Sequence, residues 1–295
     1  EEKVESIQSA MHTSSVPRTR PNIIVILADD MGYGDLGANN EGSKIPTPNL
    51  DRLAGEGVRF TDAHAASSIC TPSRYALLTG RYAWRSRLKR GIVWEWDGPL
   101  IESERDTIGS LLRRQGYRSA CIGKWHLGWD WPTKDGRHPN ETLPFGVGRP
   151  MESRAAYAEN IDFSGRIGGG PIERGFDSYF GVDVPNFSPY TWFRDDRLTE
   201  VPTVEKPAGI YGNRGPSVPG WTHEPMIPAF VEEAKTVIES AGGSPFFLYL
   251  PLTSPHSPVV PNEQFLGRSG CGRYGDFVCE VDWVVGEVMA AVEQA

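Results

Sequence analysis

The sequence predicts an α/β protein whose mostly parallel central sheet is flanked by helices. Apolar runs rich in β-branched and aromatic residues alternate with amphipathic segments, which is typical of βαβ units. The run NIIVILADD (22–30) is continuously apolar before its two carboxylates, so its strand should be buried on both faces. Polar side chains follow three such runs, at the edge where open α/β sheets bind ligands.

Length and composition allow a sizeable core. The chain has 295 residues, of which 39% are hydrophobic and 23% charged, values typical of a globular protein. No apolar run is long enough to span a membrane, and a net charge of -8 argues against a general nucleic-acid binder. Residues 1–20 are polar and lack the apolar core of a signal peptide. We therefore expect an N-terminal tail (1–20) and one α/β domain (21–295).

Four elements are predicted between residues 22 and 80. After the strand at 22–30, TPNLDRLAGEG (47–57) predicts a helix, with Thr47 or Asn49 as cap and Gly55 or Gly57 as stop. VRFTDAHAA (58–66) is expected to form a short strand, and YALLTG (75–80) to begin the next helix.

The alternation then repeats towards the C-terminus. Helices are predicted at DTIGSLLRRQG (106–116) and PAFVEEAKTVIESAGG (228–243), and a last one at VDWVVGEVMAAVEQA (281–295). Strands are predicted at YRSACIGKWHLG (117–128) and PFFLYLPLTSPHSP (245–258).

Residues 130–228 differ from the rest, because they are rich in Gly, Pro, Trp and Tyr and show little periodicity. We expect long loops with short strands there, in an insertion that faces the substrate. Tryptophans near this region could stack on a ligand, but aromatic side chains are first of all core residues. The basic run RYAWRSRLKR (81–90) is either a solvated face or the lining of an entrance for a polyanion.

Five polar side chains follow the predicted strands. Asp29 and Asp30 follow the first strand, Lys124 and His126 a middle one, and His256 the last. Because the carboxyl ends of parallel strands meet at one edge, we expect these side chains to lie together. Taken singly, an aspartate pair is also typical of a turn or a helix cap, and a lone histidine of a structural role.

Four motifs resemble those of the type I sulfatases, which belong to the alkaline-phosphatase-like superfamily. CTPSR (70–74), followed by YALLTGRY, matches their CxPSR signature, and GKWHLG (123–128) resembles their second signature. ADDMGYGDLG (28–37) resembles their N-terminal metal-binding strand, and SPHSP (254–258) their distal histidine loop. The motifs occur in the family's order, so the resemblance implies the alkaline-phosphatase-like sulfatase fold.

The resemblance implies that a separate maturation enzyme converts Cys70 to Cα-formylglycine. The hydrated aldehyde is a gem-diol, which attacks sulfur with one hydroxyl and expels sulfate with the second. By the same resemblance, Arg74 holds the diol and Lys124 contacts the sulfate. His126 takes the proton of the second hydroxyl, and His256 helps to protonate the leaving alcohol. An unmodified Cys70 would instead be a small buried residue or half of a disulfide.

The resemblance also implies a divalent cation, with Asp29, Asp30 and the residue-70 diol as metal ligands. The family uses Ca²⁺, and Mg²⁺ is the second choice for such hard oxygen ligands. The family adds an Asp-Asn pair and a second lysine on a later strand, which residues 1–295 do not contain. We therefore expect the fold to lack its C-terminal part, and residues 1–295 alone to bind metal weakly and show little activity. Cys271 and Cys279 could form a local disulfide.

These features predict a sulfuric ester hydrolase that removes sulfate from a sulfated carbohydrate. One alternative is a phosphonate or phosphodiester hydrolase of the same superfamily, and another is an inactive sulfatase-like protein that binds sulfated glycans. The expected partners are a sulfated saccharide and the formylglycine-generating enzyme, with no nucleic acid and no membrane. The expected location is periplasmic or extracellular, with a signal peptide already removed.

Overall fold

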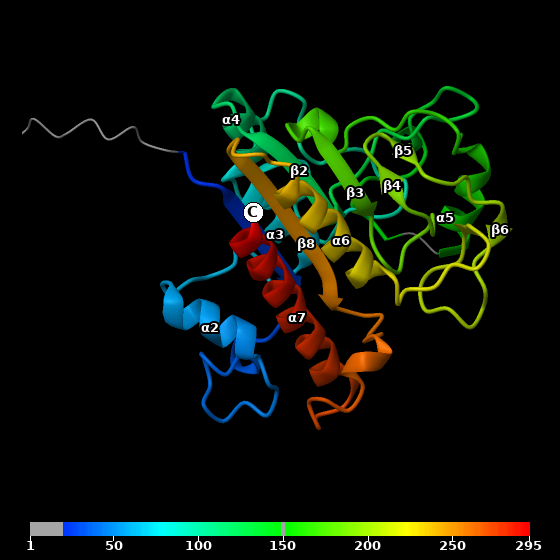
Figure 1. The fold of residues 1–295 in the computed structure, drawn as a ribbon. Coiled ribbons are helices and arrows are strands. Elements are labelled where there is room, and N and C mark those ends of the chain that lie inside the picture. Colours follow the sequence, from blue (N-terminus) through cyan, green and yellow to red (C-terminus); the bar gives the residue numbers. More distant parts are fainter. Residues whose placement is uncertain (1–19, 149–150) are drawn as a thin grey trace, which may run out of the picture.

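The main sheet has six strands in the order β1-β8-β2-β3-β4-β5 (Figure 1). The computed structural model describes residues 20–148 and 151–295. The four parallel strands are β1 (Ile23–Asp29), β8 (Phe246–Pro255), β2 (Arg118–Lys124) and β3 (Ser178–Val182). The antiparallel strands β4 (Phe193–Arg194) and β5 (Arg197–Leu198) extend one edge. The prediction of a mostly parallel α/β sheet is confirmed.

Helices cover both faces of this sheet. On one face lie α6 (Met226–Glu239) and α7 (Arg273–Gln294), and on the other lie α3 (Cys70–Thr79) and α4 (Ile108–Arg114). Every residue of β8 is buried: Phe247 and Tyr249 pack on the α3 side, while Leu248 and Leu250 pack on the α6 side. Continuous apolar runs are therefore required here, because successive side chains enter opposite cores.

Most predicted elements are present with bounds close to those expected. Thr47 precedes α2 (Pro48–Glu56), and Gly57 follows it. Thr107 caps α4 by accepting a hydrogen bond from the backbone N–H of Ser110. The last helix, α7, begins eight residues earlier than the sequence pattern indicated.

The predicted strand at 58–66 is wrong. This segment pairs with no strand of the described chain, and Phe60 is 75% exposed. A β-type pattern forms a strand only where a sheet edge is available to pair with it. The helix after it also begins earlier than expected, at Cys70 rather than Tyr75.

Residues 130–228 contain short elements joined by long loops. Besides β3, β4 and β5, they include α5 (Met151–Tyr157) and a small ribbon formed by β6 (Val204–Glu205) and β7 (Pro216–Ser217). Several tryptophans lie in one aromatic core rather than on the surface: Trp96, Trp125, Trp129 and Trp131. Trp84 is exposed.

All four cysteines are free thiols, so the structure does not contain the Cys271–Cys279 disulfide. Cys279 is buried within α7, whereas Cys271 is exposed in the loop before it. Cys121 is a core residue of β2, and burial raises the pKa of its thiol. Among the described residues, we find no helix with the length and apolar character needed to cross a bilayer.

Candidate active site

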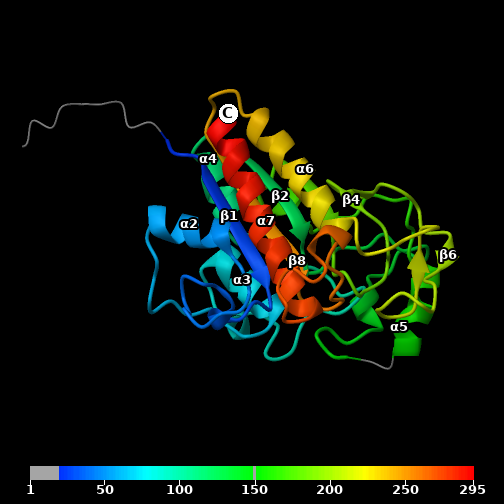
Figure 2. The same cartoon turned by 60° about the horizontal axis from the view of Figure 1, so that its bottom comes forward.

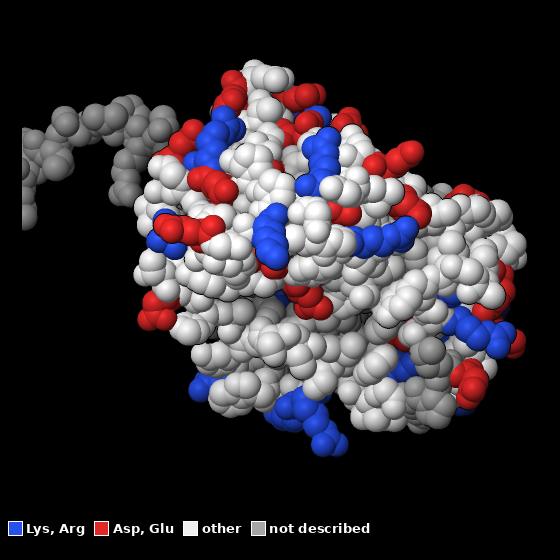
Figure 3. All heavy atoms as spheres, turned by 90° about the horizontal axis from the view of Figure 1, so that it is seen from below, with Lys and Arg blue, Asp and Glu red and all other residues white. Residues whose placement is uncertain are grey.

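The carboxyl ends of β1, β8 and β2 lie side by side at the lower edge of the sheet (Figure 2). Asp29 ends β1, Lys124 ends β2, and His256 directly follows β8. Viewed from below, the surface is hollowed near its centre, and acidic side chains lie in the hollow (Figure 3). Parallel pairing of these strands thus gathers residues distant in the sequence.

A pocket of about 470 Å³ opens at this edge. Its wall includes Asp29, Asp30, Cys70 and Arg74, together with Tyr274 from the start of α7. Cys70 is the first residue of α3, where the unpaired N–H groups of a helix N-terminus favour anions. The predicted nucleophile Cys70, Arg74 and the two predicted metal-binding aspartates therefore line the same pocket.

Asp29 is buried between two cations. Its Oδ2 lies 2.6 Å from Lys124 Nζ, and its Oδ1 lies 3.4 Å from a terminal nitrogen of Arg74. Burial alone would raise the pKa of this carboxyl, but Lys124 and Arg74 outweigh it and lower the pKa to about 2. Lys124 is fully buried and lines no part of the pocket.

Arg74 connects the three adjacent strands β1, β8 and β2 near their carboxyl ends. One terminal nitrogen donates to the backbone carbonyl of Lys124 (2.8 Å), and the other donates to that of Leu252 (3.4 Å). Burial would lower the pKa of Arg74, but Asp29 raises it, so the guanidinium stays charged. Its Nε is buried without a hydrogen-bond partner among the described residues. A fixed positive charge is therefore held beside Cys70.

His126 lies behind the pocket wall. Its ring Nε2 is 3.0 Å from the carbonyl oxygen of Val93. Because a carbonyl only accepts hydrogen bonds, Nε2 carries the proton, and Nδ1 of the neutral ring has a free lone pair. Nδ1 is buried and has no partner among the described residues. Burial, assisted by Lys124 and Arg74, lowers the pKa of His126 well below its ordinary value, so the ring is a neutral base.

Thr71 and Asp183 fix the backbone of His126. Thr71, next to Cys70, donates its hydroxyl to the His126 carbonyl (3.1 Å). The His126 N–H donates to Asp183 Oδ1 (3.2 Å), and burial raises the pKa of Asp183 to about 6. These contacts hold His126 at a φ of +55°, an uncommon angle for a non-glycine residue.

His256 and Asp30 form the outer part of the site. His256 Nε2 lies 3.5 Å from Asp30 Oδ2, while Nδ1 contacts the backbone carbonyl of Ser257 at 2.5 Å. The Asp30 side chain is 56% exposed, in contrast to the buried Asp29. The imidazole is thus presented at the mouth of the site rather than in its interior.

The described residues do not fit a complete calcium site. Calcium takes about six to eight oxygen ligands. The described part of the chain contains no group of three or more His, Cys, Asp or Glu side chains arranged to hold a metal ion. Asp29 and Asp30 supply two carboxylates, and both oxygens of Asp29 already face Lys124 and Arg74.

Three residues of the site were not identified from the sequence. Asp183 follows β3 directly, so the strand-end argument that selected Asp29 applies to it as well. Thr71 occurs within CTPSR but has no distinctive spacing of its own. The Tyr274 hydroxyl lies within hydrogen-bond distance of Asp35 Oδ2 (2.6 Å) and of the Asp30 carbonyl (3.1 Å), contacts that no sequence pattern indicates.

The basic run at 81–90 begins at the far end of α3 from Cys70. Arg81 pairs with Glu102 at 3.0 Å, and Arg85, Lys89 and Arg90 are exposed. Of the two alternatives predicted for this run, its position favours the solvated face, because none of its residues lines the pocket.

Gly123, the first residue of GKWHLG, allows β2 and β8 to approach closely. Its φ is +130°, and a Cβ atom there would lie 2.0 Å from the carbonyl oxygen of Pro251. We expect Gly123→Ala to destabilise the fold by about 3 kcal/mol, from backbone strain and overpacking together. Gly136→Ala is a matched control, because Gly136 has a φ of +73° and open space around it. If denaturant titrations show that Gly123→Ala and Gly136→Ala lower the free energy of unfolding equally, this explanation is contradicted.

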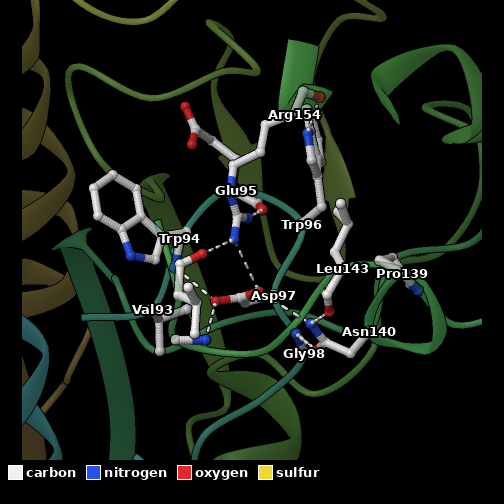
Figure 4. Close-up of polar contacts among 12 residues, drawn as sticks. Val93, Trp94, Glu95, Trp96, Asp97, Gly98, Pro139, Asn140, Leu143 and Arg154 are labelled. Atoms are coloured by element: carbon white, nitrogen blue, oxygen red, sulfur yellow. Dashed lines mark hydrogen bonds and ion pairs between the residues drawn. The ribbon is translucent and has the colours of Figure 1, made fainter. Parts of the chain in front are cut away.

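Residues 93–97 form a hydrogen-bonded segment (Figure 4), and the Val93 carbonyl at its start contacts His126. Asp97 accepts hydrogen bonds from the N–H of Trp94 (3.0 Å) and the amide of Asn140 (3.0 Å). Arg154 lies 3.6 Å from Asp97 and also donates to the Glu95 carbonyl. The carboxylate of Glu95 points away from Asp97 and accepts a hydrogen bond from the Asn213 amide at 2.5 Å.

Glu95 is expected to make stability depend on pH. Burial raises its pKa from 4.5 to about 7, although Asn213 and Arg154 favour the carboxylate and Asp183 opposes it. A raised pKa means that stability falls as pH rises from about 4.5 through 7, because the buried carboxyl must then ionise. We expect Glu95→Gln to match the wild type near pH 4.5 and to be about 3 kcal/mol more stable at pH 8. A stability difference that does not change with pH would contradict this assignment.

A solved structure with the same fold indicates the class of protein to which this chain belongs. A Bacteroides thetaiotaomicron sulfatase, solved in work on the metabolism of multiple glycosaminoglycans, superposes with a TM-score of 0.74. It is 30% identical, and the match covers 94% of this chain and 60% of that one. The fold is therefore that of this sulfatase.

Sequence comparison identifies the family. The family model described as Sulfatase matches residues 21–295. An N-acetylgalactosamine-6-O-sulfatase of Bacteroides thetaiotaomicron is 34% identical over 93% of this chain and 56% of its own length. Human arylsulfatase H is 32% identical over 93% of this chain and 54% of its own. The chain belongs to the sulfatase family, and it spans about half the length of these curated relatives.

Proposed function

We propose that this chain carries the catalytic centre of a sulfuric ester hydrolase acting on a sulfated carbohydrate. The observation that supports this most strongly is the shared pocket, in which Cys70 of CTPSR lies with Asp29, Asp30 and Arg74. Lys124 contacts Asp29, and His256 contacts Asp30. A sulfate ester is an anion, so a site for it needs fixed positive charge next to the nucleophile.

In the proposed reaction, Cys70 is first converted to formylglycine and hydrated to a gem-diol. One hydroxyl attacks sulfur and loses its proton to solvent, the sulfur–oxygen bond to the sugar breaks, and His256 donates a proton to the departing alcohol. Nδ1 of His126 then removes the proton of the second hydroxyl, which expels sulfate and restores the aldehyde. Arg74 and Lys124 offset the negative charge of the sulfate and of the oxygens of residue 70.

We propose that Asp29 and Asp30 are part of a divalent-cation site, with Ca²⁺ preferred over Mg²⁺. These two carboxylates and the residue-70 oxygens are too few for a full calcium shell, so further ligands are required. When bound, such a cation would supply additional positive charge at the sulfate.

The proposed substrate is a sulfated saccharide met in the periplasm or outside the cell. A relative named for N-acetylgalactosamine-6-O-sulfate makes a 6-sulfated hexosamine the first compound to test. The test is hydrolysis by the full-length protein across a panel of defined sulfated sugars. Faster cleavage of an aryl phosphodiester than of any sulfate ester would favour a phosphodiester hydrolase instead. Binding of sulfated glycans without cleavage would favour an inactive binding protein.

A further inference from the structure

A second pocket, of about 750 Å³, lies among the loops beyond β6. We call it the loop pocket; it is lined by Asn186 and by residues of the segment 205–214. Its volume is within the range of about 300–1,000 Å³ that is usual for ligand pockets. None of the residues assigned above to catalysis lines it.

Lys206 places a buried positive charge in the wall of the loop pocket. This lysine is only 8% exposed, and its ammonium donates to the backbone carbonyls of Pro207 and Ile210. An ammonium has three donors, so one remains available. No carboxylate of the described chain forms an ion pair with Lys206, whereas Arg214 pairs with Glu205 at 3.5 Å. An anionic group on a ligand would compensate this buried charge.

The remaining wall offers the contacts that a sugar ring uses. Tyr211 presents an aromatic ring that is 58% exposed. The amide oxygen of Asn186 is buried and has no hydrogen-bond partner in the described part of the chain. A hydroxyl group could donate to that oxygen while the apolar face of a pyranose packs on the tyrosine ring.

Two chains of contacts connect the loop pocket with His126. Phe187, next to Asn186, packs edge-on against the His126 ring, with 5.8 Å between ring centroids. On the other side, Asn213 donates to Glu95, two residues from the Val93 carbonyl that contacts His126. Phe187 and the segment 93–97 therefore connect residues that line the loop pocket with His126.

We propose that the loop pocket binds an anionic sugar residue of the substrate chain, carrying a carboxylate or a second sulfate. The anionic group accepts a hydrogen bond from Lys206, the ring packs on Tyr211, and a hydroxyl donates to Asn186. The sugar whose sulfate ester is hydrolysed then lies on the Cys70 side of Phe187. This inference rests on the proposed function, because it assigns a second subsite of the same substrate.

The kinetic test uses Lys206→Met in the full-length protein, with Lys44→Met as control because Lys44 is exposed and distant in the fold. Substrates are a sulfated monosaccharide and disaccharides that extend it with a neutral, a carboxylated or a sulfated neighbour. We expect Lys206→Met to lower kcat/KM by about 10-fold to 100-fold, through KM, only for the disaccharides with an anionic neighbour. If the wild type cleaves one of the two anionic disaccharides faster, the carboxylate or sulfate of that disaccharide is the anion that the loop pocket prefers. Equal losses on the monosaccharide, or no loss on any disaccharide, would overturn the proposal.

A binding test separates this inference from the hydrolase proposal. Calorimetry measures binding of the same disaccharides without the scissile sulfate, to Cys70→Ala and to Cys70→Ala combined with Lys206→Met. Tyr211→Ala gives a second variant that removes only an exposed ring, should Lys206→Met fold poorly. Binding that is lost in both pocket variants supports the subsite even if no sulfate ester is ever cleaved. Binding that neither substitution changes contradicts it.

Discussion

Asp29→Ala is expected to destabilise the protein by about 3–5 kcal/mol and to lower its Tm by about 10 °C. The reason is that Lys124 and Arg74 would remain as buried cations, at 0% and 1% exposure, without their shared carboxylate. Truncating one partner of a buried pair costs more than the pair contributes, because an uncompensated charge is left behind.

Asp30→Asn is the control for this experiment, because Asp30 has a φ of +62°, where Asn is tolerated better than Ala. Asp30 is the adjacent carboxylate, but its side chain is 56% exposed, and among the described residues that side chain forms an ion pair with His256 alone, at 3.5 Å. Exposed ion pairs contribute about 1 kcal/mol or less, so its removal should change stability little. Equal effects of the two substitutions in thermal or denaturant unfolding would show that Asp29 does not hold the three strand ends together.

Cys70→Ala is expected to abolish sulfate ester hydrolysis, lowering kcat by roughly 10⁴-fold or more, because it removes the proposed nucleophile. Cys70→Ser should instead react once and stop, because a serine has no second hydroxyl with which to expel the sulfate. Its mass should rise by one sulfo group after incubation with substrate. Cys271→Ala, at an exposed cysteine that does not line the pocket, should keep full activity. Continued turnover by Cys70→Ala would exclude residue 70 as the nucleophile.

The strand-end argument explains how much of the site could be predicted from the sequence. Asp29, Lys124 and His256 follow recognisable apolar runs, and parallel pairing then brings them to one edge. Asp183 obeys the same rule, but its strand β3 is only five residues long and lies within a region of irregular sequence. Short strands in Gly- and Pro-rich stretches have too little periodicity to be identified.

The remaining features depend on tertiary contacts that no local pattern encodes. The tautomer of His126 is set by a carbonyl 33 positions earlier, at Val93. The loop pocket combines Asn186 with Lys206, and the Asn213–Glu95 contact joins residues 118 positions apart. The strand predicted at 58–66 is wrong for the opposite reason. The segment has a local preference for a strand, but it pairs with no strand of the described chain.

The most direct test is the mass of the tryptic peptide Phe60–Arg74, which contains Cys70 as its only cysteine. It should be prepared from full-length protein made together with a formylglycine-generating enzyme and shown to hydrolyse a sulfate ester. We predict a peptide lighter by the difference between a thiol and an aldehyde, and reactive towards a hydrazide. An unmodified Cys70 in every peptide of such an active preparation would contradict the proposed nucleophile.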